Sequence, residues 1–71
     1  MNAYQLLKRI KSICKENGWQ LETRKGATSH QILYLTSDRG RFTAVLPMNR
    51  KPMGTGMKTQ VIRNLNLKDY F

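Results

Sequence analysis

The sequence contains very few of the residues from which metal sites, disulfides and catalytic triads are built. Among its 71 residues there is one cysteine, Cys14, and one histidine, His30. One cysteine cannot form an internal disulfide, and one cysteine with one histidine cannot complete a zinc site. The four acidic residues are scattered, so they indicate neither a two-metal carboxylate cluster nor a Ser-His-Asp triad. No glycine pattern matches a phosphate-binding loop or a dinucleotide fingerprint, and we predict no metal and no small-molecule cofactor.

Long apolar stretches are also missing. The longest apolar run, residues 32–35, is far shorter than the about 20 residues that a membrane-spanning helix needs. The N-terminal residues lack the apolar segment of a signal peptide. Together with the single cysteine, these absences favour a cytoplasmic protein, and the short chain predicts one domain covering residues 1–71.

Positive charge, by contrast, is abundant. Thirteen Lys and Arg residues face four acidic ones, which gives a formal net charge of +9. An excess of this size on one small domain creates a positive potential over much of its surface. The expected partner is therefore a polyanion, which means RNA, DNA, an anionic membrane or an acidic protein.

Apolar residues recur at helical spacing in two segments. The members of the first stripe are Ala3, Leu6, Leu7, Ile10, Ile13 and Cys14. Gly18 follows this stripe and is suited to the left-handed conformation that ends a helix. The members of the second stripe are Met57, Val61, Ile62 and Leu65, with Thr55 as the expected N-cap. The outer face of the first helix carries Tyr4, Lys8, Lys11 and Lys15, which are either a solvated face or a row of phosphate contacts.

Three segments between the helices have the composition of strands. They cover residues 19–24, 30–36 and 41–46, joined by a loop at 25–29 and a turn at 37–40. The short turn, in which Gly40 can adopt a positive φ, predicts a hairpin, and the three strands predict an antiparallel meander. A long loop follows from Pro47 to Gly56. The tail residues expected to pack on the core are Leu67, Tyr70 and Phe71. Trp19 is expected in the core, with stacking on RNA as the alternative. The core is also expected to contain Met48, Met53 and Met57, for which the alternative is an adaptable contact with a protein partner.

The resulting order is α-β-β-β-α, an α+β fold with a three-stranded antiparallel sheet. Two helices with one apolar stripe each cannot cover both faces of the sheet, so we expect both helices on one face. The other face is then open to a ligand or partner. Tyr34 shares strand parity with His30, and it either lies on this open face, where it can stack on a base, or packs in the core.

One imidazole among many cations is the remaining candidate for chemistry. RNA cleaves itself when its 2′-hydroxyl attacks the adjacent phosphate, and histidine titrates in the range needed to take that proton. Lys or Arg can stabilise the negative charge of the transition state. Lys25, Arg24 and Arg41 are the candidates for that role. The alternative is that His30 is an ordinary strand residue.

Four stretches of the sequence together resemble the HicA family of toxin mRNA interferases. They are "ENGWQLETRKG", "SHQILYL", "RFTAVLPMNRKPMGTG" and "VIRNLNL", in this order. The similarity extends from about Leu6 to Leu67. The sequence differs from the family pattern in three places. The Gly-to-His stretch, Gly26–His30, is two residues longer, and an asparagine, Asn66, replaces the final glycine. The Gly-Thr that begins the last helix matches by identity at Gly54-Thr55 but by spacing at Gly56-Met57.

The resemblance implies a double-stranded-RNA-binding-domain-like fold and a type II toxin of the stress response. It implies that His30, in the Ser29-His30 pair, is the catalytic histidine of a metal-independent endoribonuclease that cleaves mRNA without the ribosome. It also implies a HicB-like antitoxin that covers the face around His30 and neutralises the toxin.

Two other functions remain open. The chain is also consistent with a non-catalytic RNA-binding module of the double-stranded-RNA-binding type, which reads shape and charge. Its phosphate contacts would come from Lys8, Lys11, Lys15, Arg39 and Arg41. The third possibility is a basic partner for an acidic protein, without nucleic acid.

Overall fold

The first helix, α1, forms because its N-terminal groups are capped and one of its faces is apolar. The computed structural model describes residues 1–71, and α1 covers Ala3–Asn17. Asn2 and Gln5 form a capping box, in which each backbone N–H donates to the other side chain at 2.9 Å. The helix ends at Gly18, which has φ 69°, and this confirms the predicted left-handed cap.

Three strands follow and form one antiparallel sheet in the order β1-β2-β3. They are β1 (Gln20–Lys25), β2 (His30–Ser37) and β3 (Gly40–Pro47), and each boundary lies within one residue of its prediction. Gly40 follows the β2–β3 turn and is the first residue of β3, and its φ of 126° is a value that glycine adopts without strain.

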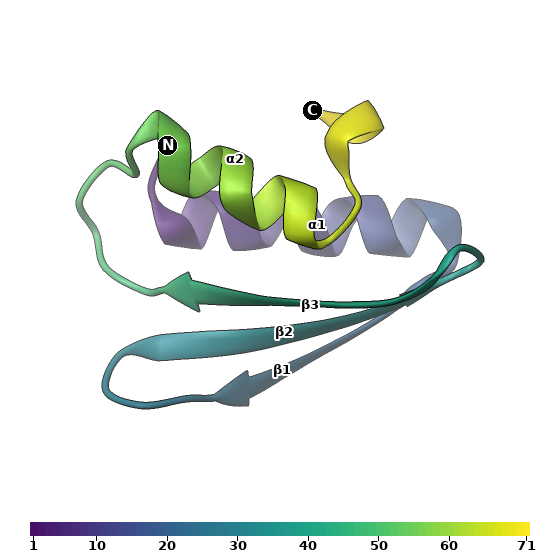
Figure 1. The fold of residues 1–71 in the computed structure, drawn as a ribbon, viewed down its shortest axis with the longest axis horizontal. Coiled ribbons are helices and arrows are strands. Elements are labelled where there is room, and N and C mark those ends of the chain that lie inside the picture. Colours follow the sequence, from purple (N-terminus) through teal and green to yellow (C-terminus); the bar gives the residue numbers. More distant parts are fainter.

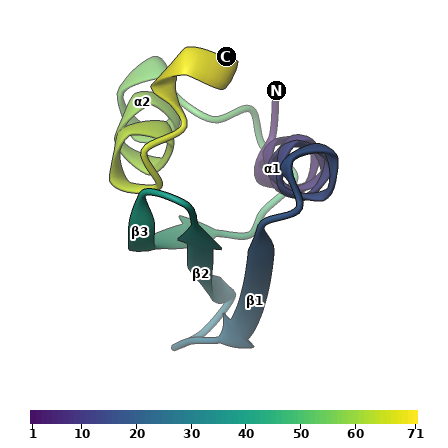
Figure 2. The ribbon, with the colours of Figure 1, turned by 90° about the vertical axis from the view of Figure 1, so that its right-hand side faces the viewer.

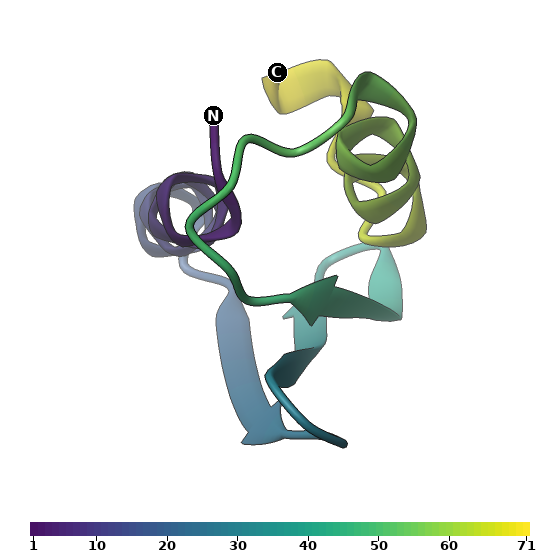
Figure 3. The ribbon, with the colours of Figure 1, turned by 90° about the vertical axis from the view of Figure 1, so that its left-hand side faces the viewer.

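Both helices lie on the same face of this sheet, as predicted. Figure 1 shows α1 and α2 on one side of the three strands, and the end views in Figures 2 and 3 place α1 toward β1 and α2 toward β3. The opposite face carries no helix. Neither helix combines the length and the apolar character that crossing a bilayer requires.

The second helix, α2, covers Thr55–Asn64 and begins earlier than its apolar stripe suggests. Gly54, in an extended conformation, is the N-cap, and no side chain bonds to the free N–H groups. The prediction that Thr55 caps the helix is therefore wrong, because Thr55 is already its first helical residue. A short 3-10 helix, η1 (Lys68–Tyr70), ends the chain.

The core lies between the sheet and the helices and contains 13 buried residues. Strand residues Leu33, Leu35, Ala44 and Leu46 contribute to it from one face of the sheet, as the alternation of side chains requires. The other buried residues are Ala3, Leu6, Ile10, Ile13, Cys14, Val61, Ile62, Leu65 and Leu67.

Most of the expected peripheral packing is also present. Residues that are half-buried against the core include Trp19, Met48, Met53 and Tyr70. Two expectations were wrong, because Met57 and Phe71 remain 47% and 44% exposed. Met57 lies in the first turn of α2, on the same side of the helix as the buried Val61, so its exposure shows that this end of the helix extends beyond the core.

Candidate active site

The β1–β2 connection is a closed turn that fixes the position of His30. Gly26 N donates to His30 O at 2.8 Å, and His30 N donates to Ala27 O at 3.1 Å. Thr28 has φ 54°, a left-handed conformation that is uncommon for a β-branched residue. His30 is thus the first residue of β2 and follows a turn that two internal backbone hydrogen bonds close.

The imidazole is oriented by the same turn. His30 Nδ1 lies 3.0 Å from Ala27 O, and a carbonyl oxygen can only accept a hydrogen bond. From this contact we assign the proton of the neutral ring to Nδ1, which puts the lone pair on Nε2. Thr28 Oγ1 donates to the same carbonyl at 2.7 Å and lies 3.1 Å from Nδ1. Nε2 makes no hydrogen bond with the protein, so the half-buried ring presents a free basic nitrogen.

The end of β3 adjoins this turn. His30 is paired with Pro47, and Met48 N donates to Ser29 O at 3.1 Å. The β3–α2 loop therefore starts beside the histidine, and its exposed Arg50 and Lys51 follow within a few residues. The sequence offered only a weak signal for this, since both cations lie in a loop without periodicity.

Of the predicted cations, Arg24 and Lys25 lie at the same end of the sheet as His30. Arg24 is paired with Ile32 and Lys25 with Gln31. Because side chains alternate, Arg24 lies on the open face with His30, whereas Lys25 points to the other side. The Arg24 guanidinium lies 5.3 Å from the centre of the Tyr34 ring, and its Nε lies 3.1 Å from a Glu22 oxygen.

Arg41 and Arg39 lie at the opposite end. Arg41 is paired with Thr36, six residues from His30, or about 20 Å along the strand. Arg39 lies just before Arg41, in the β2–β3 turn, and its guanidinium lies 3.8 Å from an Asp69 oxygen. The expectation that Arg41 stands beside the imidazole is wrong, because the hairpin places the start of β3 against the end of β2.

The lysine row belongs to a different layer. Lys8, Lys11 and Lys15 are all exposed on α1, and α1 lies on the face of the sheet opposite the His30 side chain. The structure therefore does not bring these three lysines together with the imidazole.

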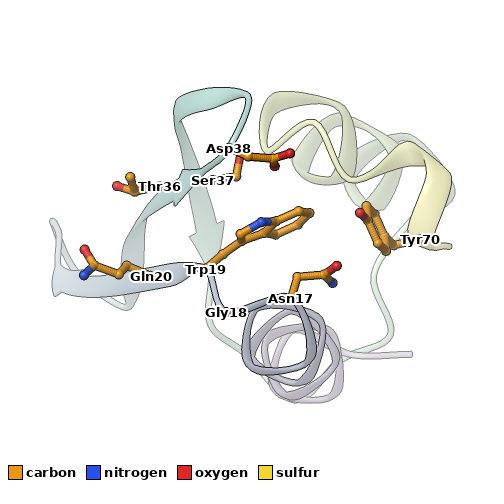
Figure 4. A pocket seen from close by; sticks show the side chains of 8 residues that line it. All are labelled: Asn17, Gly18, Trp19, Gln20, Thr36, Ser37, Asp38 and Tyr70. Carbon is orange, nitrogen blue, oxygen red and sulfur yellow. The ribbon is translucent and has the colours of Figure 1, made fainter.

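The largest hollow on the surface is not at His30. It has a volume of about 670 Å³ and lies where the end of α1 meets the β2–β3 turn and the chain's last residues (Figure 4). The rings of Trp19 and Tyr70 stand there edge to face, 5.3 Å apart. The hollow contains no histidine or cysteine that could act as base or nucleophile. No group of three or more His, Cys, Asp or Glu residues is placed to hold a metal ion.

Comparisons with protein-family models, with curated proteins and with solved structures each found no match for this chain. The only basis for assigning the candidate site is therefore its geometry. That geometry is a free imidazole nitrogen, held by a strained turn, on the open face of a strongly basic domain.

Proposed function

We propose that this protein is a metal-independent endoribonuclease and the toxin of a toxin–antitoxin pair of the HicA–HicB type. The observation that carries the proposal is the orientation of His30. Its Nδ1 is engaged by Ala27 O at 3.0 Å, which leaves Nε2 as the nitrogen that can take a proton from a substrate.

The reaction that suits this group is cleavage of RNA by its own 2′-hydroxyl. His30 Nε2 takes the 2′ proton while the 2′ oxygen forms a bond to the adjacent phosphorus. The bond from phosphorus to the 5′ oxygen breaks, and that oxygen receives a proton from the protonated imidazole or from water. The products are a 2′,3′-cyclic phosphate and a 5′-hydroxyl, and the balance requires no metal.

Cations at the same end of the sheet support this assignment. Arg24 lies on the His30 face, and Arg50 and Lys51 follow the strand end that bonds to Ser29. A positive group near the phosphate stabilises the charge that develops in the transition state. Arg41 and Arg39 lie about 20 Å away, and in this proposal they contact distant phosphates of a long RNA.

The fold is consistent with the same family. The sequence resemblance implies a double-stranded-RNA-binding-domain-like fold of α-β-β-β-α order, and the observed order, with both helices on one face of the sheet, supports the proposal. We propose that the open face around His30 is where mRNA enters. A HicB-like antitoxin would then neutralise the toxin in the cytoplasm by covering this face.

The test is an RNA cleavage assay in EDTA with the wild type and His30→Ala. General acid–base catalysis contributes about 10²- to 10⁴-fold, so we expect the variant to lose activity by that factor. Gln31→Ala is the matched control, because Gln31 is also half-buried and adjoins His30 but faces the other side of the sheet. Equal cleavage by folded wild type and His30→Ala would refute the proposal.

A second candidate function is supported by the lysine row on α1. Lys8, Lys11 and Lys15 are exposed along one side of a 15-residue helix, an arrangement that could contact successive phosphates of duplex RNA. If the protein is a non-catalytic binding module, replacing these lysines with glutamine lowers the salt dependence of duplex binding. The logarithmic slope then falls by about 0.9 for each phosphate that the protein no longer neutralises. His30→Ala changes nothing in that case.

A further inference from the structure

The open face of the sheet carries one aromatic side chain at its centre. Tyr34 lies in the middle strand, between Glu22 of β1 and Thr43 of β3. Its neighbours in β2, Leu33 and Leu35, are buried against the helices, so Tyr34 faces the other way. The ring is half-buried although no helix covers it, because side chains from all three strands surround it.

Two shallow hollows adjoin the Tyr34 ring. One, of about 410 Å³, lies over β1 and β2, and its other lining residues are Gln20, Leu21, Glu22 and Thr36. The second, of about 350 Å³, is lined by residues of all three strands, which are Glu22, Leu35, Thr36, Arg41, Phe42 and Thr43. Tyr34 lines both, whereas Arg24, whose guanidinium lies 5.3 Å from the ring centre, lines neither. The Tyr34 ring therefore contacts the Arg24 guanidinium on one part of its surface and is open to the two hollows on another.

The chemistry of this surface fits an unpaired nucleobase. A flat aromatic ring stacks on any base, and hydroxyl and carboxylate groups beside it can bond to the base edge. Thr36 and Thr43 supply hydroxyls and Glu22 supplies a carboxylate that accepts from base N–H groups. Arg24 and Arg41 flank the face, and the domain has a net charge of +9, which complements a phosphate backbone.

The position of the ring relative to His30 also favours a single strand. Tyr34 and His30 lie on one face of one strand, four residues or about 13 Å apart. A single RNA strand that runs along β2 therefore passes both side chains. A duplex could not do so with its bases stacked on Tyr34, because paired bases are stacked on each other.

We propose that the open sheet face, centred on Tyr34, binds an unpaired base of single-stranded RNA. This deepens the proposed nuclease function and rests on it for its biological meaning, since it names single-stranded RNA as the substrate class. The binding itself is independent of cleavage and can be measured separately.

The experiment measures binding of a short single-stranded RNA whose 2′ oxygens are methylated, so that 2′-hydroxyl attack cannot occur. Loss of one base–aromatic stack weakens binding between about fivefold and about 100-fold. We expect Tyr34→Ala and Tyr34→Leu to lose affinity within this range, and Tyr34→Trp to retain it. Leucine keeps an apolar side chain without a π face, so it separates stacking from packing. The matched control is Phe71→Leu, because Phe71 is an exposed aromatic residue at the C-terminus, away from the open sheet face, and its ring also has an arginine, Arg9, 6.0 Å from its centre.

Each outcome decides the proposal. Single-strand affinity that falls in folded Tyr34→Leu but not in Phe71→Leu, with duplex affinity unchanged, supports it. Unchanged single-strand affinity in folded Tyr34→Leu overturns it and leaves the face to a protein partner. Equal losses for single-strand and duplex RNA overturn it too. Because the probe cannot be cleaved, an inactive wild type in the cleavage assay would overturn the proposed function without affecting this measurement.

Discussion

The neighbouring residues Val45 and Leu46 of β3 test whether the sheet has one buried and one open face. Leu46 is fully buried, whereas Val45, which points to the other side, is 50% exposed. Leu46→Ala removes buried methyl and methylene groups and leaves a cavity, which costs about 2–5 kcal/mol of unfolding free energy. A domain of 71 residues has about 4–10 kcal/mol in total, so this single change removes a large share of it.

Val45→Ala is the matched control. It removes two methyl groups that are half in water, and we expect a loss of at most about 1 kcal/mol. Urea denaturation followed by circular dichroism gives both free energies, and thermal unfolding should place Leu46→Ala at least about 8 °C below the wild type. Similar losses for the two variants would refute the two-layer arrangement, because they would mean that both faces of β3 are covered equally.

Three further predictions concern the helix end, the free thiol and the C-terminal contact. Gly18→Ala should lower stability by about 1 kcal/mol in urea denaturation, because φ 69° is strained for alanine. Burial raises the pKa of the Cys14 thiol, so iodoacetamide should modify it slowly until urea unfolds the chain; rapid labelling of folded protein would contradict its burial. Asp69→Ala should leave the melting temperature unchanged, since its contact with Arg39 is exposed and long, at 3.8 Å.

Helical periodicity and strand composition were sufficient to predict the layers of this fold. The apolar spacing of α1 repeats over many residues, and β2 is rich in residues that favour strands, so single exceptions do not hide either signal. These patterns predicted the three strands and predicted that helices cover only one face of the sheet. Strand parity left Tyr34 with two alternatives, and only the burial of its neighbours Leu33 and Leu35 places it on the open face. The ends of elements were less predictable, since the start of α2 depends on the backbone conformation of Gly54, which side-chain chemistry does not determine.

The candidate site was predictable only in part. His30 could be selected because the chain has no other imidazole, but the group that orients it could not. That group is the carbonyl of Ala27, and a backbone atom leaves no signal in residue types. The expectation for Arg41 failed for a similar reason. Its place on the strand next to β2 does not determine its distance from His30, because that distance depends on the register, which pairs Arg41 with Thr36. Arg50 and Lys51 lie in a loop without periodicity, and only the bond from Met48 N to Ser29 O shows that this loop begins beside His30.

The central claim is that His30 Nε2 takes the 2′ proton and thereby starts cleavage of RNA without a metal. The most direct measurement is the mass of the fragments that the wild-type protein produces in EDTA. The account predicts upstream fragments whose 3′ ends carry a 2′,3′-cyclic phosphate and downstream fragments with 5′-hydroxyl ends, with about 10²- to 10⁴-fold slower formation of both by His30→Ala. Fragments with 3′-hydroxyl and 5′-phosphate ends, or cyclic phosphates produced equally by folded His30→Ala, would contradict it.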